Sequence, residues 1–459
     1  MTNLWILTEE RPKKEVLAKI LEKISLDKGF SHEFRKLIIK PILDGDKFTF
    51  TYELLGFVSD QIERIYIKSV SGSGSFVDFL IFLQDDEPTI NDEPLYAIEE
   101  TKTDDSESRN TGVYQRCSKF VYVDLYYPSC KKIMLYNLKI NQKEEPTETN
   151  IFGTRMLLNL GVEIMGKNLS EEVFQKFEDI DELIEFKDNM RSPPGGNVPI
   201  LLKKSNNSIE ISGRLWKANS LSHDPNMGAL SLISKTLREL GWENKIIITQ
   251  HGLSQKHLTG RNKFVRIANE IGISLKGLKL PQSNLPEDYW HYEQNSEKIG
   301  TIFLHLVLDE LKNVKGIYEN HAGCERGYFY TQDNIPVALH KYIKNDKKRG
   351  KIPKIPDLIV ADNEGKLILN LEGKTQSNLE EGLEDIKLFD TIEEEYIEVY
   401  YPDFEIKRGV VLFGGDEEEI ENEKVLFLLN KEGKMILSEN TPEIISKAID
   451  LIKNLNKKE

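Results

Sequence analysis

The feature that most constrains this chain is a short pattern of carboxylates, lysine and strand-like runs that occurs twice. In the first copy, Asp78 lies in the apolar run of residues 76–82, and a second apolar run ends at Glu100 and Lys102. Residues two apart in a strand share a face, so Glu100 and Lys102 are predicted to project together toward Asp78 on a neighbouring strand. Glu99 is a competing assignment, but it falls on the face opposite Lys102.

The second copy has the same order nearer the other end of the chain. Asp357 follows Pro356 and begins a short apolar run, and residues 366–371 lead directly to Glu372 and Lys374. The glutamate and the lysine are again two apart and are predicted to share a strand face. One such spacing arises easily by chance, but two copies indicate a repeated structural unit.

A Tyr-Tyr-Pro tripeptide follows each copy, at residues 126–128 and 400–402, and leads into another apolar run. Between the glutamate and the tripeptide, residues 112–123 and 379–389 are compatible with helices. The order strand, loop, strand, helix, strand is a mixed α/β order. We therefore predict an α/β fold class with two mixed-sheet units of one broad architecture.

The length of 459 residues exceeds what one hydrophobic core usually supports. Residues 10–42 are predicted to be helical, because apolar positions among them recur at helical spacing. Residues 192–197 have the proline and glycine content of a linker. We predict three domains, namely residues 1–195 with the first copy, residues 196–285 as a central recognition region, and residues 286–459 with the second copy.

Two carboxylates beside a lysine suit the hydrolysis of a phosphodiester bond. The pairs Asp78 with Glu100 and Asp357 with Glu372 each offer the hard oxygen ligands that Mg²⁺ prefers. Such an ion polarises the phosphate, lowers the pKa of an attacking water and stabilises the leaving oxygen. The ammonium groups of Lys102 and Lys374 are predicted to orient the water or to balance charge in the transition state.

These residues resemble the PD-(D/E)xK nuclease superfamily, and more narrowly the restriction endonucleases. The residues of the second copy that match its signature are Pro356, Asp357, Glu372 and Lys374. The first copy matches at Asp78, Glu100 and Lys102, with Val77 in place of the proline. The resemblance covers the surroundings of each motif and does not extend to the middle of the chain.

The resemblance implies two PD-(D/E)xK nuclease-like units. The stretch between them has no catalytic spacing, so we predict that it is a central α/β recognition region. Residues 399–413 look like the end of the cleavage domain of type IIS restriction enzymes. The implied activity is that of a type II restriction endonuclease, which cleaves double-stranded DNA with Mg²⁺ at or near a short sequence. Two different sites on one chain would let a monomer cut both strands, whereas an enzyme with one site dimerises to do so.

Two alternatives to this interpretation stay open at the level of the sequence. The same chemistry would serve a repair or other defence nuclease that acts on branched or single-stranded DNA. The other alternative is a protein that binds DNA with one or both nuclease sites inactive, although the intact sets of acids and lysine argue against it.

The net charge of −15 is unfavourable for a partner of DNA, because phosphate contacts come from Lys and Arg. Net charge is a poor guide where basic residues cluster, and here one cluster lies mid-chain and another precedes Asp357. The residues predicted to contact double-stranded DNA are Lys256, Arg261, Lys263, Arg266, Lys347, Lys348 and Arg349.

The spacing of cysteines and histidines argues against a further metal site. The three cysteines form no CxxC pair, so we expect neither a disulfide framework nor a zinc site of the usual spacing. The same cysteine content predicts a cytoplasmic location. No apolar run approaches the roughly 18 residues of a membrane span, so no membrane partner is expected. The histidines expected to be structural or to contact DNA are His223, His251, His257, His291, His305, His321 and His340.

Overall fold

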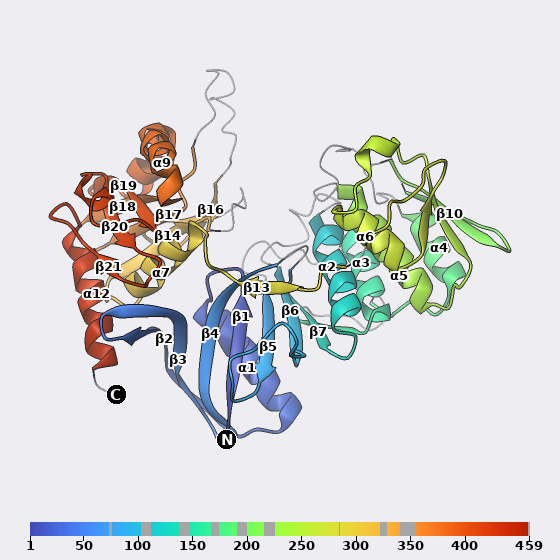
Figure 1. The fold of residues 1–459 in the computed structure, drawn as a ribbon, viewed down its shortest axis with the longest axis horizontal. Helices are drawn as coiled ribbons and strands as arrows, with labels where there is room; N and C mark the ends of the chain where they lie inside the picture. The colour runs from blue at the N-terminus through green and yellow to red at the C-terminus, as the bar shows by residue number, and fades with distance from the viewer. Residues whose placement is uncertain are drawn as a thin grey trace. The chain divides into compact units, whose positions relative to one another are not determined.

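The chain is a mixed α/β protein with several sheets (Figure 1). The computed structural model describes residues 1–72, 76–101, 112–136, 147–166, 174–190, 200–214, 225–283, 285–321, 328–339 and 354–457. Within these ranges no helix combines the length and the apolar character that crossing a membrane requires.

The chain divides into two compact units. The first comprises residues 1–70, 84–86 and 292–459, and the second comprises residues 71–83 and 87–291. The second copy of the motif therefore belongs to the first unit, and the first copy belongs to the second unit. The division into three domains stays a prediction.

The N-terminal part of the first unit is rich in strands. Its elements are β1 (Thr2–Thr8), α1 (Lys14–Lys28), β2 (His32–Asp44), β3 (Lys47–Ser59) and β4 (Ile62–Gly72). The strands have the order β2-β3-β4-β1, in which β1 runs parallel to β4 and the other neighbours are antiparallel. Gly29 ends α1 with a φ of 70°, a left-handed conformation that suits glycine. The helix expected over residues 10–42 is therefore wrong beyond this glycine, because β2 follows.

The C-terminal part of the first unit builds a mixed sheet around the second motif. Its elements are α7 (Lys298–Leu308), β14 (Val314–Glu319), β17 (Leu358–Asp362), β18 (Leu367–Thr375), α9 (Leu379–Asp385), β19 (Glu405–Phe413), β20 (Val425–Leu429), β21 (Met435–Ile436) and α12 (Glu443–Asn456). The strand order is β14-β17-β18-β19-β20-β21. The pairs β14–β17 and β17–β18 are antiparallel, whereas β18, β19 and β20 run parallel to one another.

Helices cover both faces of this sheet at close range. A Cβ atom at Gly373 of β18 would lie 2.6 Å from the methyl carbon of Thr301 in α7. A Cβ atom at Gly382 of α9 would lie 2.6 Å from Cγ of Lys374 in β18. Because adjacent residues of a strand point to opposite faces, α7 and α9 cover opposite faces of the sheet.

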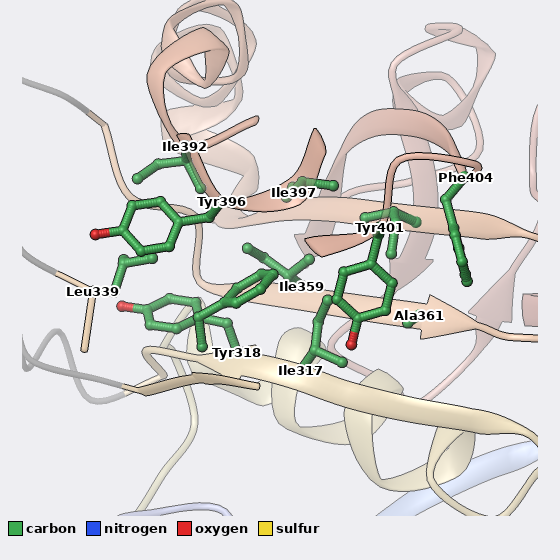
Figure 2. Packing of buried hydrophobic residues seen from close by; sticks show 12 residues of the cluster. Ile317, Tyr318, Leu339, Ile359, Ala361, Ile392, Tyr396, Ile397, Tyr401 and Phe404 are labelled. Carbon is green, nitrogen blue, oxygen red and sulfur yellow. The ribbon is translucent and has the colours of Figure 1, made fainter. Parts of the chain in front are cut away.

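The segment after α9 packs a hydrophobic core onto β14 and β17 (Figure 2). It consists of α10 (Asp390–Ile392), a π-helical turn (Glu393–Ile397) and α11 (Glu398–Tyr400). Figure 2 shows its side chains, among them Tyr396, next to Ile359 of β17. Tyr401 of the second Tyr-Tyr-Pro tripeptide is buried here, and its hydroxyl donates to the carbonyl of Tyr330 at 2.8 Å. This tyrosine therefore serves packing. Two short strands, β15 (Tyr328–Tyr330) and β16 (Pro336–Ala338), pair with each other nearby in the sequence.

The second unit repeats the local topology around the other motif. Its first elements are β5 (Phe79–Leu83), β6 (Tyr96–Thr101), α2 (Gly112–Tyr126), β7 (Lys131–Tyr136), α3 (Glu148–Asn159), β8 (Val162–Met165) and α4 (Ile180–Asn189). The pair β5–β6 is antiparallel, and β6, β7 and β8 run parallel. The strands β17 to β20 have the same directions, and in both places a helical segment connects the second strand to the third. The two motif regions thus share an antiparallel pair, a helix and a parallel strand.

The rest of the second unit forms a separate small sheet of order β12-β11-β10-β9. Its elements are β9 (Leu201–Lys204), β10 (Ser208–Ser212), α5 (Pro225–Glu239), β11 (Lys245–Thr249), α6 (Lys263–Glu270) and β12 (Ile273–Leu275), and β13 (Trp290–Tyr292) follows in the sequence. Strand β9 is antiparallel to β10, and the other neighbours are parallel.

A largely buried ion pair connects the helical segment to the sheet and tests this fold. Arg408 donates to both carboxylate oxygens of Glu393, and Asn370 donates to the same group at 2.9 Å. The variant Glu393→Ala removes the acceptor of these donors, so we expect the free energy of unfolding to fall by about 2 kcal/mol. The exposed neighbour offers a control, and Glu394→Ala should change it by less than about 0.5 kcal/mol. Urea unfolding followed by circular dichroism measures both, and equal effects would contradict the prediction.

Candidate functional site

Asp357 and Glu372 oppose each other where β17 pairs with β18. Leu358 pairs with Leu371 in this antiparallel ladder, so the next opposed positions are Asp357 and Glu372. Directly opposed residues share a face of the sheet. The N–H of Asp357 donates to the carbonyl of Leu371 at 3.1 Å, and Oδ2 of Asp357 accepts the N–H of Gly373 at 2.9 Å. These two bonds fix the register that brings the carboxylates together.

Lys374 lies beside this carboxylate pair and is held by α9. Its Nζ lies 3.1 Å from Oε1 of Glu372 and 3.2 Å from Oδ2 of Asp385. Gly382 leaves the space through which the lysine stem runs. Lys354 contacts the same oxygen of Asp385 at 2.7 Å. The structure thus brings together the residues predicted for the second copy and adds Asp385, which no sequence motif indicated.

Burial and like charge oppose the ionisation of both carboxylates. Burial raises the pKa of Asp357, and the negative charge of Glu297, next to α7, adds to this effect although the Gly373 N–H opposes it. Burial and the charge of Asp357 likewise raise the pKa of Glu372. Oε2 of Glu372 is buried without a hydrogen-bond partner among the residues that the structure describes. Two such carboxylates are suitable ligands for a divalent cation, which would favour their ionised forms.

The neighbours of Lys374 keep it positively charged. Burial disfavours the ammonium form, but the carboxylates of Glu372 and Asp385 outweigh burial and raise the pKa of Lys374. Burial also opposes ionisation of Asp385, but hydrogen bonds from Lys354 and Lys374 lower the pKa of that carboxyl. Lys374 therefore provides a fixed positive charge at neutral pH and does not accept a proton.

In the first copy, the structure places Glu99 opposite Asp78. Phe79 pairs with Ile98 in the β5–β6 ladder, so the next opposed positions are Asp78 and Glu99. Oδ2 of Asp78 accepts the backbone N–H of Glu100 at 2.6 Å. The sequence pattern predicted Glu100 at this place, but the ladder puts Glu99 there, and a shift of one residue moves a side chain to the other face of a sheet.

The bond from Asp78 to the next amide aligns the two copies residue by residue. By this alignment Glu99 corresponds to Glu372, Glu100 to Gly373, and Thr101 to Lys374. The strand position of the lysine is therefore occupied by threonine in the first copy. Lys102, the lysine predicted from the sequence, lies outside the described residues.

Lys119 of α2 supplies an ammonium group at the first carboxylate pair. Its Nζ lies 2.7 Å from the carboxylate of Glu99 and 3.5 Å from Oδ1 of Asp78. Burial and the charge of Asp78 raise the pKa of Glu99 to about 8, although Lys119 opposes the shift. Thr101 accepts a hydrogen bond from Arg116 of the same helix at 2.7 Å. Two carboxylates and an ammonium therefore meet here as well, with the lysine on the helix.

Lys263, the first residue of α6, is buried near this first pair. Its Nζ lies 5.1 Å from the ring centroid of Tyr122, whose hydroxyl donates to the carbonyl of Lys263 at 3.0 Å. Burial and the charge of Lys119 lower the pKa of Lys263 to about 7. Of the other residues predicted to contact DNA, Lys256 and Arg261 are exposed, Arg266 is partly buried, and Lys347, Lys348 and Arg349 lie outside the described residues.

Comparisons with known proteins do not identify a family. No protein-family model matches the chain, and no curated protein matches it. Among solved structures, the 2,6-sialyltransferase of Vibrionaceae Photobacterium sp. JT-ISH-224, in a ternary complex with CMP and lactose, has 10% sequence identity and a TM-score of 0.10. The match covers 54% of this chain and 39% of that chain, so it spans well under two thirds of the matched structure.

The raised pKa values predict how the stability of the metal-free protein depends on pH. The folded state holds protons on Asp357 and Glu372 that the unfolded state has already released, so the free energy of unfolding should fall as pH rises above the ordinary carboxyl range. The variant Glu372→Gln should make this dependence less steep, whereas Glu380→Gln, at an exposed position, should leave it unchanged. Urea unfolding in a chelator across this pH range measures the slopes. An unchanged slope in Glu372→Gln would contradict the burial argument.

Proposed function

We propose that this chain is a Mg²⁺-dependent endonuclease of double-stranded DNA, of the type II restriction class. The observation that carries the proposal is the meeting of Asp357, Glu372 and Lys374 on an antiparallel strand pair. A helical segment and a parallel strand follow that pair, as the resemblance to PD-(D/E)xK nucleases implies. The buried Oε2 of Glu372, which has no hydrogen-bond partner in the described part of the chain, fits a cation ligand.

Each residue of the second site has a separate role in this proposal. Asp357 and Glu372 would hold the ion, and the N–H of Gly373 keeps Asp357 oriented. Bound Mg²⁺ would polarise the phosphate and lower the pKa of the attacking water. Lys374 stays protonated, so it orients the water and balances the charge that develops on the phosphate. Asp385 positions the lysine from the side of α9.

The first site performs the same chemistry with a lysine from a different element. Asp78 and Glu99 take the roles of Asp357 and Glu372, and Lys119 takes the role of Lys374. The ammonium contacts its glutamate at 2.7 Å in the first site and 3.1 Å in the second. In this proposal each site cuts one strand, so that a monomer makes a double-strand break. Of the predicted basic residues, the exposed Lys256 and Arg261 would provide phosphate contacts.

Cleavage of supercoiled plasmid tests the division of labour. With Mg²⁺ the unmodified protein is expected to give discrete linear fragments, because both strands are cut. Glu372→Gln and Glu99→Gln should each accumulate nicked circles, since each removes one ion ligand and slows one site by about 100-fold or more. The double variant should leave the plasmid supercoiled. Discrete fragments would indicate a restriction enzyme, and a smear would indicate a less specific nuclease. Retention of uncut plasmid on the gel would indicate an inactive DNA-binding protein.

Neighbouring residues provide matched controls for the first site. Glu100→Gln and Lys102→Met alter the residues that motif spacing alone selects, and both variants should still cut both strands. Lys119→Met should produce nicked circles, as Glu99→Gln does. If instead Lys102→Met nicks and Lys119→Met cuts both strands, the assignment of the helix lysine is wrong.

The affinity for Mg²⁺ should rise with pH, because the ion needs ionised ligands and burial raises the pKa of Asp357, Glu372 and Glu99. We expect at least about a tenfold gain between about pH 6 and about pH 8, since one pKa unit changes the ionised fraction by up to about tenfold. Isothermal titration calorimetry of the unmodified protein measures it, with the double variant Glu99→Gln and Glu372→Gln as the control. An affinity independent of pH would count against these carboxylates as ligands.

A further inference from the structure

Two histidines that are 16 residues apart meet inside the first unit. Nδ1 of His305, in α7, lies 3.0 Å from Nε2 of His321, just after β14. Oε2 of Glu319, the last residue of β14, lies 3.5 Å from Nδ1 of His305. One ligand atom from each of these three residues lies within 4.8 Å of the others. His305 is 2% exposed and His321 is 9% exposed, so both imidazoles are buried, whereas the side chain of Glu319 is 24% exposed.

The outer nitrogen of each imidazole faces an oxygen acceptor. Nε2 of His305 lies 3.5 Å from Oδ2 of Asp309, and Nδ1 of His321 lies 3.1 Å from the hydroxyl of Thr301. That hydroxyl donates its hydrogen to the carbonyl of Lys298 at 3.2 Å, so it accepts from His321. A neutral imidazole carries one N–H. In the tautomers that direct both N–H groups at these outer partners, the two nitrogens that face each other carry lone pairs.

Without an ion, one imidazole donates to the other across the 3.0 Å contact, whereas a bound cation would take a lone pair from each of the two nitrogens. We propose that His305, Glu319 and His321 bind a Zn²⁺ ion. Imidazole nitrogen and carboxylate oxygen are common zinc ligands, and ligating histidines usually donate their other N–H to an outer acceptor. Mg²⁺ prefers oxygen ligands and is unsuited to this set. The inference holds whether or not the chain is a nuclease.

Arg11 and Lys13 hold Glu319 in place and also limit what the cluster can bind. Nε of Arg11 lies 2.5 Å from Oε2 of Glu319, its NH1 lies 2.9 Å from Oδ2 of Asp309, and Lys13 contacts Oε1 of Glu319. These cations repel a divalent ion, so the bonds from the two imidazoles must provide the affinity. Replacing either histidine should therefore abolish binding, whereas replacing Glu319 should weaken it.

The ion would stabilise the backbone beside the second carboxylate pair. Asn320 lies between Glu319 and His321, and its N–H donates to the carbonyl of Asp357 at 2.7 Å. Fixing both neighbours of Asn320 to one ion therefore fixes the support of Asp357. The role of the zinc is structural, at a place separate from the proposed Mg²⁺ ligands.

Titration with Co²⁺, a visible-absorbing substitute for Zn²⁺, tests the proposal on the full chain after treatment with a chelator. We expect one equivalent of Co²⁺ to produce the visible absorption of a tetrahedral Co²⁺ site. Addition of Zn²⁺ should then remove this absorption. His305→Asn and His321→Asn should lose the signal, and the exposed control His291→Asn should keep it. Thr301→Val keeps the shape but removes the acceptor of His321, so it should weaken binding about tenfold.

The variant Glu372→Gln separates this site from the carboxylate pair. The proposal requires that Glu372→Gln keep the Co²⁺ signal even where it stops one site from cutting plasmid. Loss of the signal in Glu372→Gln, with retention in His321→Asn, would place the ion at the carboxylates and overturn the proposal. Absence of the signal in the folded, unmodified chain would also overturn it, without bearing on nuclease activity. If circular dichroism shows that the histidine variants do not fold, the Co²⁺ titrations of the unmodified chain and of Thr301→Val test the proposal instead.

Discussion

One kind of hydrogen bond sets the geometry of both motif regions. In each, an aspartate carboxylate accepts the backbone N–H of the residue that follows the opposed glutamate, namely Gly373 for Asp357 and Glu100 for Asp78. The bond holds the strand pair in one register, and a slip by one residue would turn every side chain of the strand to the other face. The closeness of the carboxylates, their raised pKa values and the place left for a lysine all depend on this register.

The two regions place the ammonium group in different ways on the same strand frame. In the first unit the lysine is Lys374 of β18. Its stem runs through the space beside Gly382, and its ammonium group contacts the carboxylate of Asp385. In the second unit the strand position is Thr101, and Lys119 reaches the carboxylates from α2. An ammonium group thus lies beside the carboxylates in both regions, but the lysine that carries it comes from a strand in one and from a helix in the other. A motif based on spacing alone therefore misses Lys119.

Local patterns in the sequence predicted the mixed α/β order. They also selected Asp357, Glu372 and Lys374, which the structure brings together, because strand alternation and the neighbouring apolar runs largely determine where these residues lie. The same reasoning favoured Glu100 over Glu99, because Glu100 and Lys102 share a strand face, whereas the ladder places Glu99 opposite Asp78. Lys119, Asp385 and the pair His305 and His321 come from elements that tertiary packing brings together, and a single sequence carries no sign of such contacts. The prediction of a helix through residue 42 did not take account of Gly29, where the backbone adopts a left-handed conformation and the helix ends.

Thr301 touches two environments from one side chain. Its methyl group faces Gly373, beside the carboxylate pair, while its hydroxyl faces His321. An isotope label on this methyl would therefore give one nuclear magnetic resonance signal that senses the occupancy of both places. Such a signal would show whether filling one of them changes the other, which makes this residue a natural reporter of communication across α7.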